Sequence, residues 1–191
     1  MRGPQPWREF RYRKRNSHTE MIIPKLGVGC FAVRANKRFE AQYPLKMVYH
    51  SYFHSIINYR TIFWRNSLYS NSIFKLQNRI IRIVMGADIT DSCRELFKTL
   101  NILSPISQYI FPLVLFVVNN KNKCRMNSEI HSINTRNNSD FYHQLSHLTL
   151  YQKGPLYMGI KLHNSLLPEI KEFAHNIKTF KSLLRRFLHQ Y

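Results

Sequence analysis

Two segments of the chain repeat hydrophobic residues at helical spacing and carry lysine and arginine, but no acid, on their remaining faces. The first, residues 71–86, reads NSIFKLQNRIIRIVMG. On a 3.6-residue period its isoleucines and leucine gather on one side, while Lys75, Arg79 and Arg82 share the polar strip. The pattern predicts a mostly buried helix with one basic edge.

Both ends of this segment hold residues that favour helix termini. Asn71 or Ser72 can cap the start, because a short polar side chain accepts hydrogen bonds from the first N–H groups of a helix. Gly86 can end the helix, because glycine tolerates the left-handed conformation that follows many helix C-termini. These residues strengthen the helix prediction.

The second segment, residues 176–190, reads NIKTFKSLLRRFLHQ and follows the same rule. Phenylalanine and leucine form one stripe, and Asn176 is placed to cap the start. Ordinary surface helices mix glutamate with lysine, so two one-signed edges favour phosphate binding over simple solvated faces. The cationic face of this segment consists of Lys178, Lys181, Arg185 and His189.

The rest of the chain also favours helices over strands. We predict a mainly α protein: an irregular helical bundle with a long polar loop and a small C-terminal helical part. The further predicted helices are a weak one at 22–34, a central one beginning at Pro44, one capped by Asp91, one with Ser104 as cap and Pro105 at its first position, and one near 156–166.

Changes in composition suggest four parts. Residues 1–20 are predicted to be a flexible basic arm, and a nuclear-localisation or nucleic-acid-binding role for this arm stays open. Residues 119–140 are polar and rich in asparagine, which indicates a linker and a domain boundary. The predicted parts are the arm at 1–20, a helical core at 21–118, a polar loop or linker at 119–152 and a C-terminal helical segment at 153–191.

The charge balance of the whole chain implies an anionic partner. Of 191 residues, 29 are Lys or Arg and ten are Asp or Glu, which gives a formal net charge of +19. A chain with this excess repels itself unless a polyanion is present, and nucleic acids and anionic lipid surfaces are the common ones. With 44% hydrophobic residues, the chain can still bury a core.

Targeting and membrane signals are weak. The apolar run at 109–118 is about half of the roughly 20 residues that a spanning helix needs, and Pro112 interrupts it. Three widely spaced cysteines do not form a secreted disulfide framework. We therefore expect no transmembrane segment and a nuclear or cytoplasmic, not secreted, protein. An arginine-rich mitochondrial presequence is an open alternative, against which Glu9 and Glu20 speak.

No motif for a metal site or a cofactor emerges. A zinc set can be assembled from Cys124, His131, His143 and His147, but no C-x-x-C pair anchors it and the gaps are irregular. His50 and His54 lie one turn apart on the predicted central helix without a nearby carboxylate or cysteine. We expect no metal, no cofactor and no catalytic residue in this chain.

Several phrases, in order, resemble one protein family. They include CFAVRANKRFEAQYPLKMVYHSYFHSIINYRTIFWRNSLYSNSIFKLQNRIIRIVMGA, DSCRELFKTLNILSPISQYIF, SEIHSINTRNNSD and LTLYQKGPLYMGIKLHNSLLPEIK. The series resembles the region after the catalytic core of non-LTR retrotransposon reverse transcriptases of the jockey-like, insect type. The likeness runs from about residue 24 to the end of the chain.

The resemblance implies a noncatalytic fragment of an RNA-directed DNA polymerase, from the part that follows the palm. Nucleotidyl transfer needs two metal ions held by clustered carboxylates, and no double aspartate occurs in the chain. Asp88 and Asp91 are better explained by a turn and a helix cap, and the family's endonuclease has no counterpart. Arg60 and Arg65 stand where such relatives usually have glycine, which suggests a truncated or decaying copy.

The function expected from these patterns is sequence-independent binding to the phosphate backbone of RNA, DNA or an RNA–DNA hybrid. The alternative is a basic structural or interaction protein that docks on an acidic partner or an anionic membrane surface. The residues expected to bind nucleic acid are Lys75, Arg79, Arg82, Arg136, Lys153, Lys178, Lys181 and Arg185.

Overall fold

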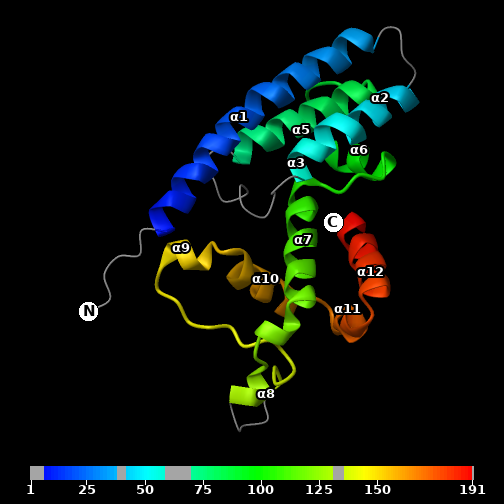
Figure 1. Cartoon of the computed structure of the whole chain (residues 1–191). Helices are drawn as coiled ribbons and strands as arrows, with labels where there is room; N and C mark the ends of the chain where they lie inside the picture. Colours follow the sequence, from blue (N-terminus) through cyan, green and yellow to red (C-terminus); the bar gives the residue numbers. More distant parts are fainter. Residues whose placement is uncertain (1–6, 38–41, 59–69, 131–135, 191) are drawn as a thin grey trace. The chain divides into compact units, whose positions relative to one another are not determined.

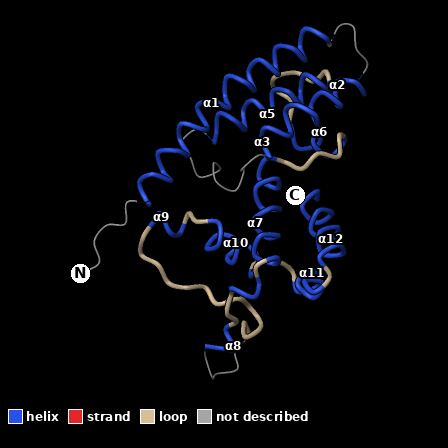
Figure 2. Tube along the Cα trace, in the orientation of Figure 1, coloured by secondary structure: helices blue, strands red, loops and turns tan. Residues whose placement is uncertain are grey.

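The described chain is almost entirely helical, as Figure 2 shows. The computed structural model describes the backbone of residues 7–37, 42–58, 70–130 and 136–190, and within these ranges every side chain except those of 7–19, 70 and 150. Over these residues the only extended pairing is an isolated antiparallel bridge between Met126 and Phe141. The prediction of a mainly α protein is confirmed.

The chain divides into two compact units, Met1–Pro105 and Ile106–Tyr191, each with its own helices. The division falls where the predicted helix starts at Pro105, and not in the polar segment 119–140 where the sequence placed the boundary. The helices of the N-terminal unit are α1 (Trp7–Asn36), α2 (Gln42–Val48), the π-helical turn η1 (Tyr49–His54), α3 (Ser55–Asn58), α5 (Ser70–Met85) and α6 (Cys93–Thr99).

Helices α1 and α5 lie side by side and run in the same direction (Figure 1). The Cys30 thiol of α1 donates to the Leu76 carbonyl of α5, with 3.8 Å between sulfur and oxygen. The apolar faces of both helices are buried with α2, η1, α3 and α6 in one hydrophobic core. Fully buried members of this core include Leu26, Tyr49, Phe53, Ile57, Ile73, Ile80 and Ile81.

A polar pair lies in this apolar core. Gln77 is fully buried, and its Nε2 donates to the Tyr49 hydroxyl at 3.0 Å. Among the described residues the Gln77 Oε1 has no hydrogen-bond partner, so this bond satisfies the donor side of the amide and links α5 to η1. Gln77 lies on the buried side of α5, so the cations at Lys75 and Arg79 point outward.

The predicted stop of α5 is confirmed in detail. Gly86 has a φ of +73°, its N–H donates to the Ile83 carbonyl, and the Ala87 N–H donates to the Arg82 carbonyl. This pair of bonds is the Schellman arrangement, which satisfies carbonyls that a helix end leaves open. At the other end the helix begins at Ser70, so Asn71 and Ser72 lie inside its first turn and do not precede it.

Three other expectations for the N-terminal unit differ from the structure. The backbone is helical from Trp7, where a flexible arm was expected, so α1 includes the weak helix predicted at 22–34. The central helix starts at Gln42 and changes to a π-helical turn at Tyr49. Ser92, not Asp91, caps α6 by accepting from the Arg94 N–H. The later part of the predicted central helix, with Arg60, lies outside the described residues, and so does Arg65.

The C-terminal unit is built around α7. Its described elements are α7 (Pro105–Asn119), the 3₁₀ turn η2 (Lys121–Lys123), α8 (Asn127–Ile130), α9 (Thr149–Gln152), α10 (Pro155–Asn164), α11 (Pro168–Lys171), the 3₁₀ turn η3 (Glu172–His175) and α12 (Ile177–Gln190). Pro105 is the first residue of α7, as predicted, because a missing N–H costs nothing at that position.

Contacts with α7 place both α10 and α12. A Cβ on Gly159 would lie 2.6 Å from the Val117 side chain and 3.0 Å from the Leu113 carbonyl, so α10 packs on α7 at a point where only glycine fits. The Ser107 hydroxyl of α7 donates to the Leu188 carbonyl of α12 at 2.9 Å. These contacts tie the unit together from its first helix to its last.

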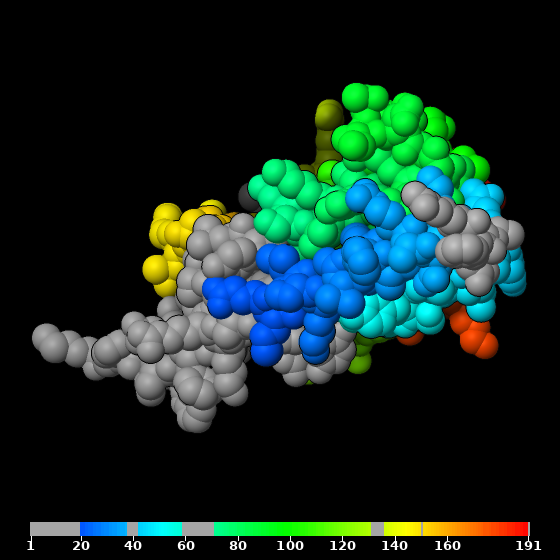
Figure 3. Space-filling view, turned by 90° about the horizontal axis from the view of Figure 1, so that it is seen from above, coloured from blue at the N-terminus to red at the C-terminus, as the bar shows by residue number. Residues whose placement is uncertain are grey.

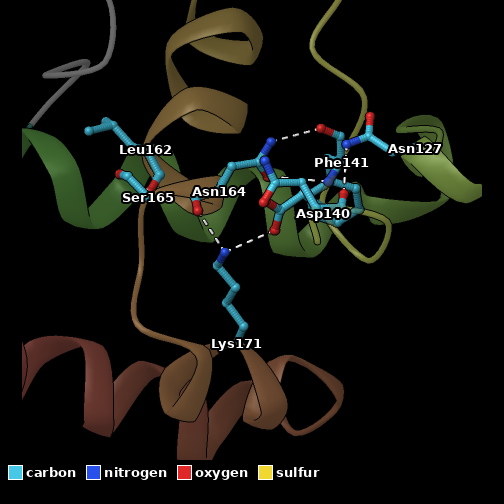
Figure 4. Close-up of polar contacts among 8 residues, drawn as sticks. Asn127, Asp140, Phe141, Leu162, Asn164, Ser165 and Lys171 are labelled. Carbon is cyan, nitrogen blue, oxygen red and sulfur yellow. Dashed lines mark hydrogen bonds and ion pairs between the residues drawn. The ribbon is translucent and has the colours of Figure 1, made fainter. Parts of the chain in front are cut away.

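The polar segment 119–140 is held to its own unit, although the sequence predicted a loose linker there. The Tyr142 N–H donates to the Arg125 carbonyl and the Asn127 N–H to the Asp140 carbonyl, so the two ends of the segment pair. Asn164 then binds both backbone groups of Phe141, accepting from its N–H at 3.2 Å and donating to its carbonyl at 2.7 Å (Figure 4). The hydrogen bonds of Asn164 to Phe141 therefore hold this segment against α10.

Candidate nucleic-acid interface

Helix α12 presents the clearest row of cations in the described structure. Lys178, Lys181 and Arg185 are exposed, and they lie on one side over about two helical turns, or about 10 Å along the axis. Phe180, Leu184 and Leu188 are buried on the other side. We call Lys178, Lys181 and Arg185 the α12 strip.

The sequence of α12 dictates this orientation. Asn176 caps the helix, because its Oδ1 accepts from the Thr179 N–H at 3.4 Å. Phe180 and Leu184 are both fully buried, so the helix cannot rotate without exposing them. His189, which was expected beside the strip, is half-buried. Burial and then the Arg185 charge lower its pKa, which favours the neutral ring and gives it no lasting role in anion binding.

Helix α5 carries a shorter row. Lys75 and Arg79 are exposed and one turn apart, so their charged ends lie on one line along the helix. We call these two residues the α5 strip. Its orientation is fixed by the buried Gln77 and by the isoleucines that precede and follow it.

Arg82, which the sequence grouped with this strip, is already engaged within the protein. Its Nε and Nη2 both donate to the Asp91 carbonyl, at 3.1 and 2.8 Å. The Asp91 carboxylate in turn accepts from the Asp88 N–H at 2.8 Å and closes the turn after α5. Arg82 therefore holds the α5–α6 connection, and we do not count it in the α5 strip.

Arg34 of α1 and Lys37, which follows this helix, are cations beside α5, and the pattern within α5 alone gave no sign of them. Burial raises the pKa of the Cys30 thiol, and the charges of Arg79 and Arg34 act against that rise. The Lys37 ammonium lies 3.6 Å from where a Cβ on Gly86 would be, at the negative end of the α5 dipole. Only the pairing of α1 with α5 brings Arg34 and Lys37 to this surface.

Arg136 and Lys153 do not extend the α12 strip. Arg136 is exposed in the turn 136–140, which pairs with α8, and Lys153 is exposed at the end of α9. Figure 1 shows α8 and α9 away from α12 within the C-terminal unit. Arg186, by contrast, is an exposed cation on α12 itself that the sequence reading left out. Within the C-terminal unit, the expected residues therefore lie in separate groups and not in one row.

The ion pairs of the described residues leave both strips without a carboxylate partner. Within the described ranges, the ion pairs join Lys98 to Glu95 at 3.2 Å and Lys171 to Asp140 at 2.9 Å. Neither pair involves a residue of the α5 or the α12 strip. Unpaired cations in a row are what a phosphate backbone binds through charge alone.

Other site chemistry is sparse. The described residues contain no group of three or more His, Cys, Asp or Glu side chains that could hold a metal ion, and His131 of the considered zinc set lies outside them. His50 and His54 lie with ring centroids 5.5 Å apart on η1, and the Asn58 amide approaches His54 Nε2 at 2.6 Å. This arrangement suits a polar helix edge better than a catalytic pair.

Comparisons with known proteins do not assign the chain to a family. No family model matches the chain, no curated protein sequence matches it, and no solved structure matches it. Among the residues that the structure describes, no helix has both the length and the apolar character to cross a membrane. The α5 and α12 strips are therefore the basis for proposing a function.

Proposed function

We propose that this chain binds nucleic-acid backbones without sequence preference, mainly through the α12 strip and secondarily through the α5 strip. The observation that carries the proposal is the row formed by Lys178, Lys181 and Arg185, exposed on one side of α12 with no acid anywhere on that helix. Such a row offers charge but no amide or carboxylate side chain positioned to read base edges.

The resemblance to reverse transcriptases of non-LTR retrotransposons gives the proposal a natural ligand. In that family the region after the palm would hold template and primer, so we propose an RNA–DNA hybrid as the preferred polyanion. The support is the ordered series of phrases in the sequence together with the basic strips. An upstream double-aspartate palm in the flanking genomic sequence would test this parentage, and its absence would count against it.

Salt dependence is the direct test of backbone binding. Each phosphate contact contributes about −0.9 to the slope of log affinity against log salt on a duplex. The two strips supply Lys75, Arg79, Lys178, Lys181 and Arg185, so we expect a slope of about −4 to −5 for the full chain. A flat response would refute the proposal.

Variants separate a specific row from general positive charge. Replacing the three residues of the α12 strip by alanine should reduce the slope by about 3, and replacing Lys75 and Arg79 by about 2. The matched control is K121A/K123A/R125A, which removes three exposed cations of the same unit from outside α12. An equal loss in the control would show that net charge, not the strip, governs binding.

The same assay distinguishes nucleic acid from the alternative partner, an anionic membrane surface. Vesicles containing anionic lipid are added as competitor to the RNA–DNA hybrid at constant salt. If vesicles displace the hybrid and α12-strip variants lose vesicle binding first, the chain is a membrane-surface protein and the proposal fails. If the hybrid remains bound, the nucleic-acid proposal stands.

A further inference from the structure

Helix α12 carries a hydroxyl group in the middle of its cations. Ser182 is exposed and follows the exposed Lys181 directly. Lys178 precedes it by four residues, and Arg185 and Arg186 follow it by three and four. Residues three and four apart are neighbours on a helix surface, with about 5–6 Å between their Cβ atoms. Ser182 therefore has cations beside it in both directions along the helix.

The helical period places these side chains around one line. At about 100° per residue, Lys178 and Arg186 lie about 40° to either side of Ser182, and Arg185 lies about 60° from it. All four residues are exposed. Serine is much shorter than lysine or arginine, so the cationic side chains can extend past its hydroxyl and approach one anion bound there.

The Ser182 hydroxyl is not occupied by the helix itself. Serine and threonine in helices often donate to a backbone carbonyl three or four residues earlier, and Ser55, Thr99 and Ser165 do so here. Among the described residues, the Ser182 hydroxyl makes no such bond. Its donor is therefore available to a ligand that binds on this side of α12.

The α5 strip lacks this arrangement. Its helix also reaches the surface, and Figure 3 shows part of α5 (green) beside α1 (blue). The exposed Ser72 has Lys75 three residues after it, but α5 begins at Ser70, so no turn of the helix precedes Ser72. The α5 strip therefore offers charge without a hydroxyl set between two cations.

A hydroxyl between cations suits the chemistry of a phosphodiester. Serine is one of the residues that donate to phosphate oxygens in nucleic-acid complexes. The attraction between charges changes gradually with distance, so cations alone hold a phosphate loosely in position. A hydrogen bond forms only over a narrow range of distance and angle. Ser182 can therefore determine where along α12 a phosphate binds.

We propose that Ser182 is a phosphate-binding residue of this chain: its hydroxyl donates to a non-bridging oxygen of one backbone phosphate, and Lys178 and Arg185 neutralise that phosphate and its neighbours. This inference rests on the proposed backbone binding and adds a defined position to it. Without the hydroxyl, the α12 strip still attracts a polyanion, but it no longer holds one phosphate at a fixed place on the helix.

A salt series with an RNA–DNA hybrid and the full chain tests this role. Because serine carries no charge, S182A should bind about tenfold more weakly than the original chain with an unchanged salt slope. S182T keeps a hydroxyl and should retain most of the affinity. S139A, the matched control, removes an exposed hydroxyl of the same unit outside α12 and should bind like the original chain.

The same series separates the failure of this inference from the failure of the proposed function. If the original chain shows the steep slope but S182A binds equally well, backbone binding stands and the role of Ser182 is wrong. An equal loss in S139A also overturns that role. A flat slope in the original chain refutes backbone binding itself. Alanine favours helix more than serine does, so circular dichroism of S182A should show no loss of helix.

Phosphorothioate substitution tests which atom accepts the hydrogen bond. Replacing one non-bridging oxygen of each phosphate by sulfur keeps the charge, but sulfur is a weak hydrogen-bond acceptor. The substituted hybrid should therefore lose more affinity for the original chain than for S182A. An equal change in both proteins would show that the Ser182 hydroxyl does not contact a phosphate oxygen, and the proposal would fail.

Discussion

Helices α5 and α12 have nearly the same sequence pattern, an apolar stripe with a basic edge and no acid, but the structure uses their cations differently. On α12 all three residues of the strip are exposed and directed away from the core. On α5 the third cation, Arg82, donates twice to the Asp91 carbonyl and stabilises the connection to α6. A one-signed helix edge therefore does not by itself identify a binding surface, because a neighbouring backbone carbonyl can take up one of its cations.

On α5 the engagement of Arg82 follows from the turn after the helix. α5 ends in the left-handed Gly86 and turns back through residues 87–92, which brings the Asp91 carbonyl within reach of Arg82. Arginine offers five donors, so a nearby turn can occupy part of its guanidinium group.

The largest predicted effect is a loss of stability of the C-terminal unit when the packing of α12 is disrupted. Replacing the fully buried Phe180 by alanine should destabilise the C-terminal unit by about 3–5 kcal/mol, because a cavity replaces the ring. Hydrogen exchange should then rise in peptides from α7 and α12 and stay unchanged in peptides from α5. Equal loss of protection in both units would contradict their separate cores.

A smaller effect would sharpen the comparison between cations of one helix. R82A should lower the free energy of unfolding of the N-terminal unit by about 1 kcal/mol, because two hydrogen bonds to the Asp91 carbonyl are lost at a half-buried position. R79A, its matched control on the same helix, should leave stability nearly unchanged and weaken hybrid binding. Denaturant titration and a binding isotherm on both variants give the two readouts.

The reverse outcome would alter the assignment of roles on α5. If R79A destabilised the unit while R82A weakened only binding, Arg82 would be a phosphate ligand and its contact with Asp91 of little weight.

Local signals predicted the helices well, and tertiary contacts decided the rest. The stop at Gly86, the cap at Asn176 and the helix start at Pro105 could be read from single residues, because each depends on backbone groups within one turn. The role of Arg82 depends on how a turn nine residues away is folded, and the nearness of Arg34 and Lys37 to α5 depends on α1 packing beside it. Sequence periodicity carries no information on such contacts.

The unit boundary shows the same limit. An asparagine-rich segment ordinarily indicates a linker, but Asn164 and the pairing of Asn127 with Asp140 bind the ends of this one to the C-terminal unit. Lys171 adds to this, since its ammonium donates to the Asp140 carboxylate at 2.9 Å and to the Asn164 carbonyl at 2.6 Å (Figure 4). Residue types that favour loops also make the hydrogen bonds that fasten a loop.

The smallest predicted effect is a pH dependence of the C-terminal unit. His163 is buried against the Phe141 ring, with 4.8 Å between ring centroids, and neither ring nitrogen accepts or donates a hydrogen bond of good geometry. Burial lowers the pKa of His163. The neighbouring Lys171 charge lowers it further, while Asn164 and Asp140 act in the opposite direction.

The sign follows from the direction of that shift. The folded unit resists protonation of His163, while the unfolded chain takes up a proton near the ordinary histidine pKa of about 6.5. Stability is therefore fully present above about pH 6.5 and is lost as the pH falls below that value towards the lowered pKa of the folded state. His189, whose pKa is also lowered, adds a smaller contribution of the same sign.

The variant H163M removes the main titrating group and keeps a side chain of similar volume. The midpoint of urea unfolding, measured by hydrogen exchange in α10 peptides, should therefore vary less between about pH 7 and about pH 5 in H163M than in the original chain. An undiminished slope in H163M would assign the pH response to a group other than the one packed on Phe141.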